Sequence, residues 1–223
     1  MLCAHVNKIN TRHIVLGSSS PRRKNALTDL GIKFEVIPSK FEENLEKKQY
    51  KYAVDYNMAT TRHKAQEIYE RVFKGKVHNE TADLIICADT IVVLNNQIIE
   101  KPESESHAFQ ILSSLSGKQH TVYTSMCFVF PKIQDPETKS EPWVHSFHES
   151  SEVLFSHLSD DMIKGYIATG SPMDKAGGYG IQDCGGSFIE KIHGDYFNVT
   201  GFPMNRFCRE LLQIIESNKW NLD

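Results

Sequence analysis

Three serines, a proline and two arginines in succession, Ser18 to Arg23, form a run with the composition of an anion-binding turn. We expect a helix to begin at Pro21, because proline is favoured at the first helical position. Ser20 then occupies the N-cap, where unpaired backbone N–H groups bind anions. Arg22 and Arg23 in the first turn oppose the helix dipole, which favours a bound anion such as phosphate beside them. The alternative is that both arginines extend into water.

A single carboxylate, Asp89, follows the apolar segment 84–88, which predicts a buried strand. Ligands bind at strand ends in α/β sheets, so a carboxylate at this place could hold a divalent ion or accept a proton from water. A turn-forming or capping aspartate is an equally good interpretation of this residue alone.

Three lysines on separated segments and one glycine-rich run are further candidates for a ligand site. Lys64, Lys101 and Lys175 could converge, although a lone lysine is more often solvated surface. The run from Asp174 to Gln182 holds three glycines, whose backbone can approach a ligand closely. Gln182 offers both a donor and an acceptor for reading a nucleobase edge. The alternative is that the glycines only turn the chain.

Apolar strands that alternate with periodic helices must position these residues, and they predict an α/β fold. The expected strands are 13–17, 33–37, 84–88, 91–94, 97–100, 121–130 and 143–155, with a hairpin turn at Asn95–Asn96 and a polar hairpin loop over 131–142. The expected helices are 21–31, 54–72 with its pattern ending at Gly75, 103–117, 159–169 and 203–215. We expect an N-terminal extension over 1–12, one domain over 13–217 and a C-terminal tail over 218–223.

Composition excludes several classes of protein. The chain has 223 residues with 25 Lys plus Arg against 28 Asp plus Glu, a net charge of 25 − 28 = −3. This charge gives no bulk attraction for a nucleic-acid backbone, so no nucleic-acid partner is expected. Apolar runs fall short of the about 20 residues of a membrane-spanning helix, so no membrane association is expected. Five dispersed cysteines without a C-x-x-C pair favour a reducing, cytoplasmic compartment, and the apolar surroundings of Cys87, Cys127 and Cys208 favour buried thiols at these three positions.

An ordered set of motifs over 13–217 resembles the Maf family of nucleotide pyrophosphatases. The motifs are SSSPRR, FEE, ADT, EKP, LSGKQHTVYT, DKAGGYGIQ and GDYFNVTGFP. The resemblance implies an elongated mixed β-sheet flanked by helices, of the Maf/ITPase-like type, with two lobes and a central cleft, often as a homodimer. It implies hydrolysis of nucleoside triphosphates to the monophosphate and pyrophosphate with Mg²⁺ or Mn²⁺, in a nucleotide housecleaning role.

The same resemblance implies roles for individual residues. Asp89 matches the proton acceptor and a metal ligand, and Glu43 matches a second acidic residue that shares the ion. Arg22, Thr90 and Gln182 match the positions that follow substrate choice, in the form typical of dTTP/UTP pyrophosphatases. Residues expected to bind the substrate are Ser18, Ser20, Arg22, Arg23, Lys64, Lys101 and Lys175. Asp183 and Cys184 follow Gln182 where the family more commonly has glycine.

Other functions remain open at this point. The chain could be a nucleotide-binding regulator of cell division that needs no turnover, although Asp89, Glu43 and Lys101 argue for catalysis. It could act on 7-methyl-GTP, although that subgroup lacks the glutamine of the DKAGGYGIQ run. A plain phosphatase would release orthophosphate instead of pyrophosphate.

Overall fold

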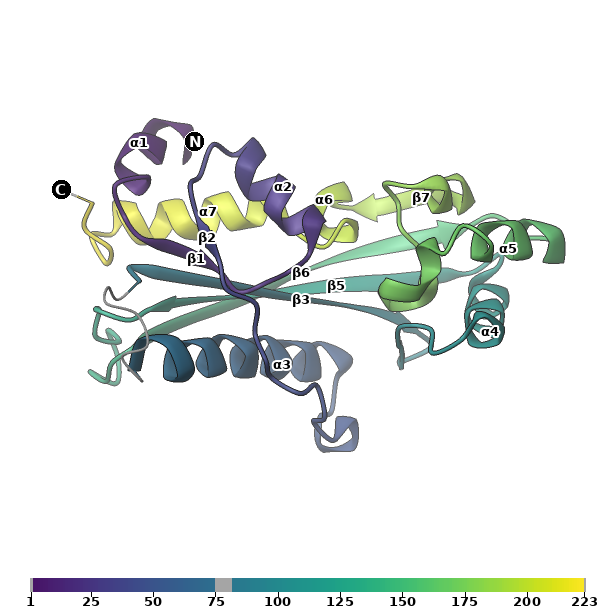
Figure 1. The fold of residues 1–223 in the computed structure, drawn as a ribbon, viewed down its shortest axis with the longest axis horizontal. Helices are drawn as coiled ribbons and strands as arrows, with labels where there is room; N and C mark the ends of the chain where they lie inside the picture. The colour runs from purple at the N-terminus through teal and green to yellow at the C-terminus, as the bar shows by residue number, and fades with distance from the viewer. Residues whose placement is uncertain (1, 75–81, 223) are drawn as a thin grey trace.

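One mixed β-sheet runs the length of the molecule, with helices on both of its faces (Figure 1). The computed structural model describes residues 2–74 and 82–222. Among these residues seven strands join in the order β2-β1-β3-β5-β6-β7, and β4 pairs with β3. The strands are β1 (Ile14–Leu16), β2 (Glu35–Val36), β3 (Leu84–Leu94), β4 (Gln97–Ile99), β5 (Gln119–Phe130), β6 (Trp143–Phe155) and β7 (Ile189–Gly194). The strand β1 is parallel to β2 and β3, and the other pairs are antiparallel. The predicted mixed α/β fold is confirmed.

Seven α-helices cover the sheet in the described part of the chain. They are α1 (Val6–Ile9), α2 (Pro21–Asp29), α3 (Ala53–Ile68), α4 (Glu105–Leu115), α5 (Asp160–Ile167), α6 (Tyr196–Val199) and α7 (Met204–Glu216). Figure 1 shows α2 and α7 on one face, α3 on the opposite face, and α4 and α5 toward the far end of the sheet. The segment 69–74 continues α3 as a π-helix. The predicted end of this pattern at Gly75 lies outside the described residues.

Side chains alternate between the two faces of the sheet and so divide the core into three clusters. One cluster joins α2 and α7 to alternate residues of the central strands, with Ile86, Ala88 and Phe128 among them. The intervening residues, such as Cys87 and Cys127, pack against α3 on the other face. The third cluster joins α4 and α5 to the opposite half of the sheet. Two halves with separate cores therefore share one continuous set of long strands.

The strand β3 carries the most consequential difference from the sequence prediction. The polar pair Asp89–Thr90 was expected to lie beyond the end of a strand at Ala88, which is wrong: β3 continues without a break to Leu94. One edge of β3 pairs with β5 through this polar pair, opposite Ser125 and Thr124, so that backbone hydrogen bonds continue across it. Asp89 therefore lies in the middle of a strand.

The other edge of β3 is divided between two partners. The strand β1 pairs with Leu84–Ile86 and β4 pairs with Val92–Leu94. Residues 87–91 lie between these two ladders, and within the described chain no strand pairs with them on that edge. This interval opens the centre of the sheet toward the loops that follow β1, β2 and β4.

Among the turns and short elements, some were predicted from the sequence and others were not. The hairpin at Asn95–Asn96 is confirmed, and both residues have the positive φ angles, 50° and 61°, that such two-residue turns require. The segment 131–142 connects β5 and β6 as predicted. The strand β7 and the helical turns of residues 2–9 were not predicted. Leu2 and Ile9 from these turns are buried in the core that includes α7.

Of the three cysteines predicted to be buried, Cys87 and Cys127 are buried and Cys208 is partly exposed. Cys87 and Cys127 are buried directly opposite one another on β3 and β5, whereas Cys3 and Cys184 are exposed. Burial raises the pKa of the Cys127 thiol to about 11 and that of Cys87 still further. Among the described helices, none is long and apolar enough to cross a membrane.

Gly17 directly follows β1 at the start of the serine turn and donates its N–H to the carbonyl of Ile86 at 2.8 Å. A Cβ at this position would collide with the buried Sγ of Cys87 and with Cδ1 of Ile68. We therefore expect Gly17→Ala to lower the free energy of unfolding by about 1–3 kcal/mol, the usual cost of overpacking. Urea unfolding followed by circular dichroism measures this change.

Gly165 provides a matched control in helix α5, because a Cβ there would meet no atom within 4 Å. Gly165→Ala should raise the free energy of unfolding by about 0.5–1 kcal/mol, since alanine is the better helix former. A Gly17→Ala variant as stable as the wild type would contradict the tight contact at the end of β1.

Candidate active site

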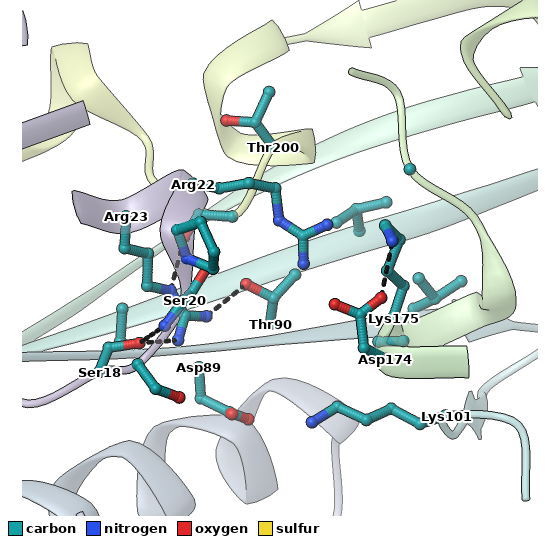
Figure 2. A pocket seen from close by; sticks show the side chains of 18 of the residues that line it. Ser18, Ser20, Arg22, Arg23, Asp89, Thr90, Lys101, Asp174, Lys175 and Thr200 are labelled. Atoms are coloured by element: carbon teal, nitrogen blue, oxygen red, sulfur yellow. Dashed lines mark hydrogen bonds and ion pairs between the residues drawn. The ribbon is translucent and has the colours of Figure 1, made fainter. Parts of the chain in front are cut away.

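A cavity of about 370 Å³ lies at the open edge of β3 and is lined by every residue that the sequence singled out. These are Ser18 and Ser20 between β1 and α2, Arg22 and Arg23 in the first turn of α2, Glu43 after β2, Lys64 on α3, Asp89 and Thr90 on β3, Lys101 after β4, and Lys175 and Gln182 in the segment before β7. Figure 2 shows the labelled members of this set converging from both halves of the molecule. The sequence could predict their types, but only the fold brings them together.

The cavity lining carries more basic than acidic side chains. Its basic residues are Arg22, Arg23, Lys64, Lys101 and Lys175, and its acidic residues are Glu43, Asp89 and Asp174. The difference is 5 − 3 = +2 in a chain whose net charge is −3. A cleft of this kind concentrates positive potential and favours an anionic ligand.

Lys64 bridges the two carboxylates of the predicted metal site. Its Nζ lies 2.6 Å from Oδ1 of Asp89 and 2.7 Å from Oε1 of Glu43. The side chains of Lys64 and Asp89 are only 13% and 12% exposed, so this ion pair is shielded from water. Burial acts to lower the pKa of Lys64, but the two neighbouring carboxylates outweigh it and hold the pKa above its ordinary value. Lys64 is therefore a firmly protonated cation beside Asp89.

A second polar group, Asn57, orients Asp89 from below the sheet. Its Nδ2 donates to Oδ2 of Asp89 at 2.8 Å, and its Oδ1 accepts from the hydroxyl of Ser125 on β5. Asn57 is fully buried, so these bonds determine which way its amide points. Sequence reasoning did not select this residue. Asn57 precedes Lys64 by seven residues, or about two helical turns, so the sequence did indicate that both side chains lie on the same face of α3.

Arg23 is held by the protein on the other face of β3. Its guanidinium donates to the carbonyl of Gly201 at 3.0 Å, to Ser18 Oγ at 3.2 Å and to Thr90 Oγ1 at 3.0 Å. Burial lowers the pKa of Arg23, although Asp89 nearby opposes this effect. Arg22 instead extends across the cavity toward Asp174 (Figure 2). The two adjacent arginines thus have different surroundings, one fixed by the protein and one facing the cavity.

Thr90 belongs to a chain of hydroxyl groups with a defined direction. Thr124 Oγ1 donates to the carbonyl of Asn198 at 3.0 Å, so it must accept the hydroxyl proton of Thr90, which lies 3.0 Å away. Thr90 in turn accepts from Arg23. The hydroxyl of Thr90 is therefore committed to the protein.

Ser20 occupies the N-cap of α2 and Pro21 its first position, as predicted, but the Ser20 side chain makes no capping hydrogen bond. Its backbone N–H donates instead to Ser18 Oγ at 3.2 Å. Figure 2 places both serines beside Arg23 at the end of the cavity opposite Lys175. The start of α2 thus faces the cavity with its backbone and with Arg22.

Lys175 and Lys101 face the cavity from the other half of the molecule. Lys175 Nζ donates to Asp174 Oδ1 at 2.6 Å, and Lys101 extends toward Asp89 (Figure 2). Asp174 is the first residue of the DKAGGYGIQ motif but was not among the predicted site residues. Burial acts to raise its pKa, but the hydrogen bond and charge of Lys175, with the charge of Arg22, hold the pKa below its usual range. Asp174 is thus an anion between two cations.

Known proteins resemble this chain over nearly all of its length. The family described as Maf-like protein matches residues 13–214. A human protein, "Probable bifunctional dTTP/UTP pyrophosphatase/methyltransferase protein", is 41% identical over 96% of this chain and 34% of its own length. Proteins named dTTP/UTP pyrophosphatase are 40% identical in Clostridium perfringens strain SM101 (89% of this chain, 95% of that protein) and 37% identical in Bacillus cereus ATCC 10987 (96% of each).

The extent of these matches differs between the relatives. The chain spans about a third of the human relative and nearly the whole of the two bacterial ones. The family match begins one residue before β1 and ends within α7, so it includes all the strands and the whole cavity. The chain belongs to the Maf family.

Proposed function

We propose that this protein hydrolyses nucleoside triphosphates, with dTTP and UTP preferred, to the nucleoside monophosphate and pyrophosphate. The observation that carries this proposal is Asp89, a shielded carboxylate held at the centre of a cavity whose other charged groups are mostly basic. A pure binding site for a triphosphate gains nothing from a carboxylate there, because like charges repel. The names of the bacterial relatives support the same reaction.

In the proposed reaction the basic side chains bind and orient the triphosphate. Arg22 and the start of α2 approach it from one side, and Lys101 and Lys175 approach it from the other. Lys64, already beside Asp89, supplies positive charge next to the reacting phosphorus. These cations offset the charge that accumulates on the leaving pyrophosphate.

Asp89 is the proposed proton acceptor. A water attacks the α-phosphorus and transfers its proton to Asp89, a new P–O bond forms, and the bond from the α-phosphorus to the bridging oxygen breaks to release pyrophosphate. Asn57 and Lys64 hold the carboxylate in place, one on each oxygen. Each carboxylate oxygen has a second lone pair, so these bonds leave capacity to accept the proton of a water.

A divalent ion fits the carboxylates of this site. Oε1 of Glu43 and Oδ1 of Asp89 both contact the ammonium of Lys64, so an ion would bind beside this lysine, at the remaining lone pairs of the two carboxylates. Carboxylate oxygens, completed by water and phosphate oxygens, are the ligands that Mg²⁺ and Mn²⁺ prefer. A bound ion would polarise the phosphoryl oxygens. Within the described residues no group of three or more His, Cys, Asp or Glu gathers as a closed metal site, which suits an ion that substrate helps to bind.

Substrate choice is proposed to depend on Arg22, Thr90 and Gln182. Gln182 is exposed at the cavity and can both donate to and accept from a pyrimidine edge. Thr90, whose hydroxyl is committed to Arg23 and Thr124, acts by fixing the shape of the wall. We also propose a homodimeric, cytoplasmic enzyme that removes non-standard or excess pyrimidine nucleotides, as the family resemblance implies.

Incubation with a panel of dTTP, UTP, CTP, dGTP, ITP and 7-methyl-GTP tests the reaction and its selectivity. We expect pyrophosphate, not orthophosphate, and the highest kcat/KM for dTTP and UTP, by at least about tenfold, the discrimination that one or two paired hydrogen bonds provide. Orthophosphate as the product would contradict the proposed bond cleavage. A preference for 7-methyl-GTP would contradict the roles of Arg22, Thr90 and Gln182.

Asp89→Asn should lower kcat by about 100- to 10,000-fold, the usual contribution of a positioned proton acceptor. The Kd for a non-hydrolysable dTTP analogue should stay within about threefold, because the amide keeps the size of the carboxylate and removes a negative charge. Stopped pyrophosphate assays and calorimetric titration measure the two quantities. Asp161→Asn, an exposed change in the first turn of α5, is the control. Near-normal turnover by Asp89→Asn would refute the assignment of the base.

Removal of divalent ions with EDTA should abolish turnover, and added Mg²⁺ or Mn²⁺ should restore it. Glu43→Gln should raise the metal concentration for half-maximal activity by at least about tenfold. Mutation of a residue that only hydrogen-bonds to a metal ligand already lowers metal affinity about tenfold, and loss of a ligand should lower it at least as much. Metal titrations of both proteins measure the shift. Full activity in EDTA would exclude the proposed ion.

A further inference from the structure

Asp183, next to Gln182, accepts hydrogen bonds from three different residues. Its Oδ1 accepts from the hydroxyl of Tyr166 at 3.0 Å and from the backbone N–H of Gly185 at 2.8 Å. Its Oδ2 accepts from the hydroxyl of Ser171 and lies 3.6 Å from Nζ of Lys175. The two carboxylate oxygens thus have different partners, and one of these, Lys175, lines the cavity.

The Oδ2 side of this network holds the Lys175 ammonium. Lys175 Nζ donates to the carbonyl of Ser171 at 2.6 Å and lies 3.2 Å from the hydroxyl of the same serine. That hydroxyl donates to Asp183, so its lone pairs are directed toward the lysine. With Asp174 at 2.6 Å on another side, the Lys175 side chain is only 13% exposed. Asp183 therefore restricts where the cation can lie.

The Oδ1 side holds the backbone that precedes Gln182. Tyr166 donates to Asp183 and accepts from the N–H of Gly180, a buried residue of the cavity wall, at 3.0 Å. Burial raises the pKa of Tyr166 to about 12, so the phenol keeps its proton and the direction of these bonds is defined. A Cβ at Gly180 would lie 2.6 Å from Asp183 Oδ2 and 2.8 Å from Cε of Lys175. The side chains of Asp183 and Lys175 therefore pack directly against the backbone of Gly180.

The ionisation of Asp183 suits this role. Burial acts to raise its pKa, but hydrogen bonds from Ser171, Gly185 and Tyr166 and the charge of Lys175 hold the pKa below its usual range. At neutral pH the group is a carboxylate that only accepts hydrogen bonds, which every one of these donors requires.

We propose that Asp183 is a positioning residue for the reaction in this cavity: through Ser171 it fixes the Lys175 ammonium, and through Tyr166 it fixes the Gly180–Gln182 backbone. It thereby controls nucleotide affinity and base selection without taking part in the chemical step. The proposal rests on the function proposed above, because it assumes that Lys175 and Gln182 contact the nucleotide.

Three variants separate the Oδ2 side of the network, which holds Lys175, from the Oδ1 side, which holds the backbone before Gln182. Asp183→Ala removes all of its bonds, and we expect the KM for dTTP to rise about tenfold, kcat to change by less than about threefold, and the preference for dTTP over CTP to shrink. Asp183→Asn keeps an acceptor for Tyr166 and Gly185 but turns an amide N–H toward Ser171 and Lys175, so its KM should rise as in Asp183→Ala while its preference for dTTP stays close to that of the wild type. Tyr166→Phe keeps the charge but removes the bridge to Gly180, and it should reduce the dTTP preference more than it raises KM.

Cys184→Ala is the matched control, since this exposed neighbour lies in the same turn and its side chain should leave all three quantities unchanged. Thermal unfolding of each variant identifies loss of folding. If Asp183→Ala does not fold, Tyr166→Phe decides the proposal by its base preference.

Two outcomes would overturn the proposal. One is an Asp183→Ala enzyme with the wild-type KM and base preference. The other is an Asp183→Asn enzyme that loses the dTTP preference as fully as Asp183→Ala, which would show that the bonds of Tyr166 and Gly185 to Oδ1 do not position the backbone beside Gln182. A wild type that releases no pyrophosphate would refute the proposed function instead. In that case the Kd of a non-hydrolysable dTTP analogue replaces KM, and an unchanged Kd in Asp183→Ala would still overturn the positioning role.

Discussion

The site depends on one backbone constraint, the incomplete pairing of β3. A strand buried in a sheet normally satisfies its N–H and C=O groups on both edges, and β3 does so with β5 on one edge through Asp89 and Thr90. On the other edge β1 ends before this pair and β4 begins after it. The interval is long enough to admit a ligand, while the continuous β3–β5 pairing keeps both halves in register. A rigid strand thus presents polar side chains where most strands present apolar ones.

Strand alternation then gives the two polar neighbours different tasks. Asp89 points to the α3 face, where Asn57 and Lys64 receive it, and Thr90 points to the α2 face, where it meets Arg23. The carboxylate is surrounded by donors and the arginine by acceptors, so each face is locally balanced. The other cations of the cavity are Arg22 on α2 and Lys101 and Lys175 in the opposite half, where Asp174 and Asp183 lie beside Lys175. Protein hydrogen bonds therefore fix the positions of Asp89, Thr90 and Arg23, whereas the other cations of the cavity supply the attraction for an anionic ligand.

Sequence patterns predicted the five longer helices, the long strands and the composition of the site, because these follow from periodicity and from motifs of several residues, but they missed the short helices α1 and α6. They failed at Asp89–Thr90, where two polar residues interrupt an apolar run and look like a strand end; only pairing with Ser125 and Thr124 on a distant strand keeps β3 intact. They also missed β7, whose exposed residues such as Glu190 and Lys191 lack an apolar alternation. Asn57 and Asp183 were not predicted as functional, because a lone amide or a turn aspartate acquires meaning only from partners far along the chain.

The five thiols of the molecule differ in burial and therefore in reactivity. Thiolates are the reactive form of cysteine, and burial raises the pKa values of Cys87, Cys127 and Cys208, the last to about 11, so these three stay protonated at neutral pH. Cys3 and Cys184 are exposed. Cys184 lies two residues beyond Gln182, so a maleimide fluorophore on this native side chain would sit at the rim of the cavity. With Cys3 replaced by serine, Cys184 is the exposed cysteine that remains and can serve as the attachment point for an optical reporter of ligand entry.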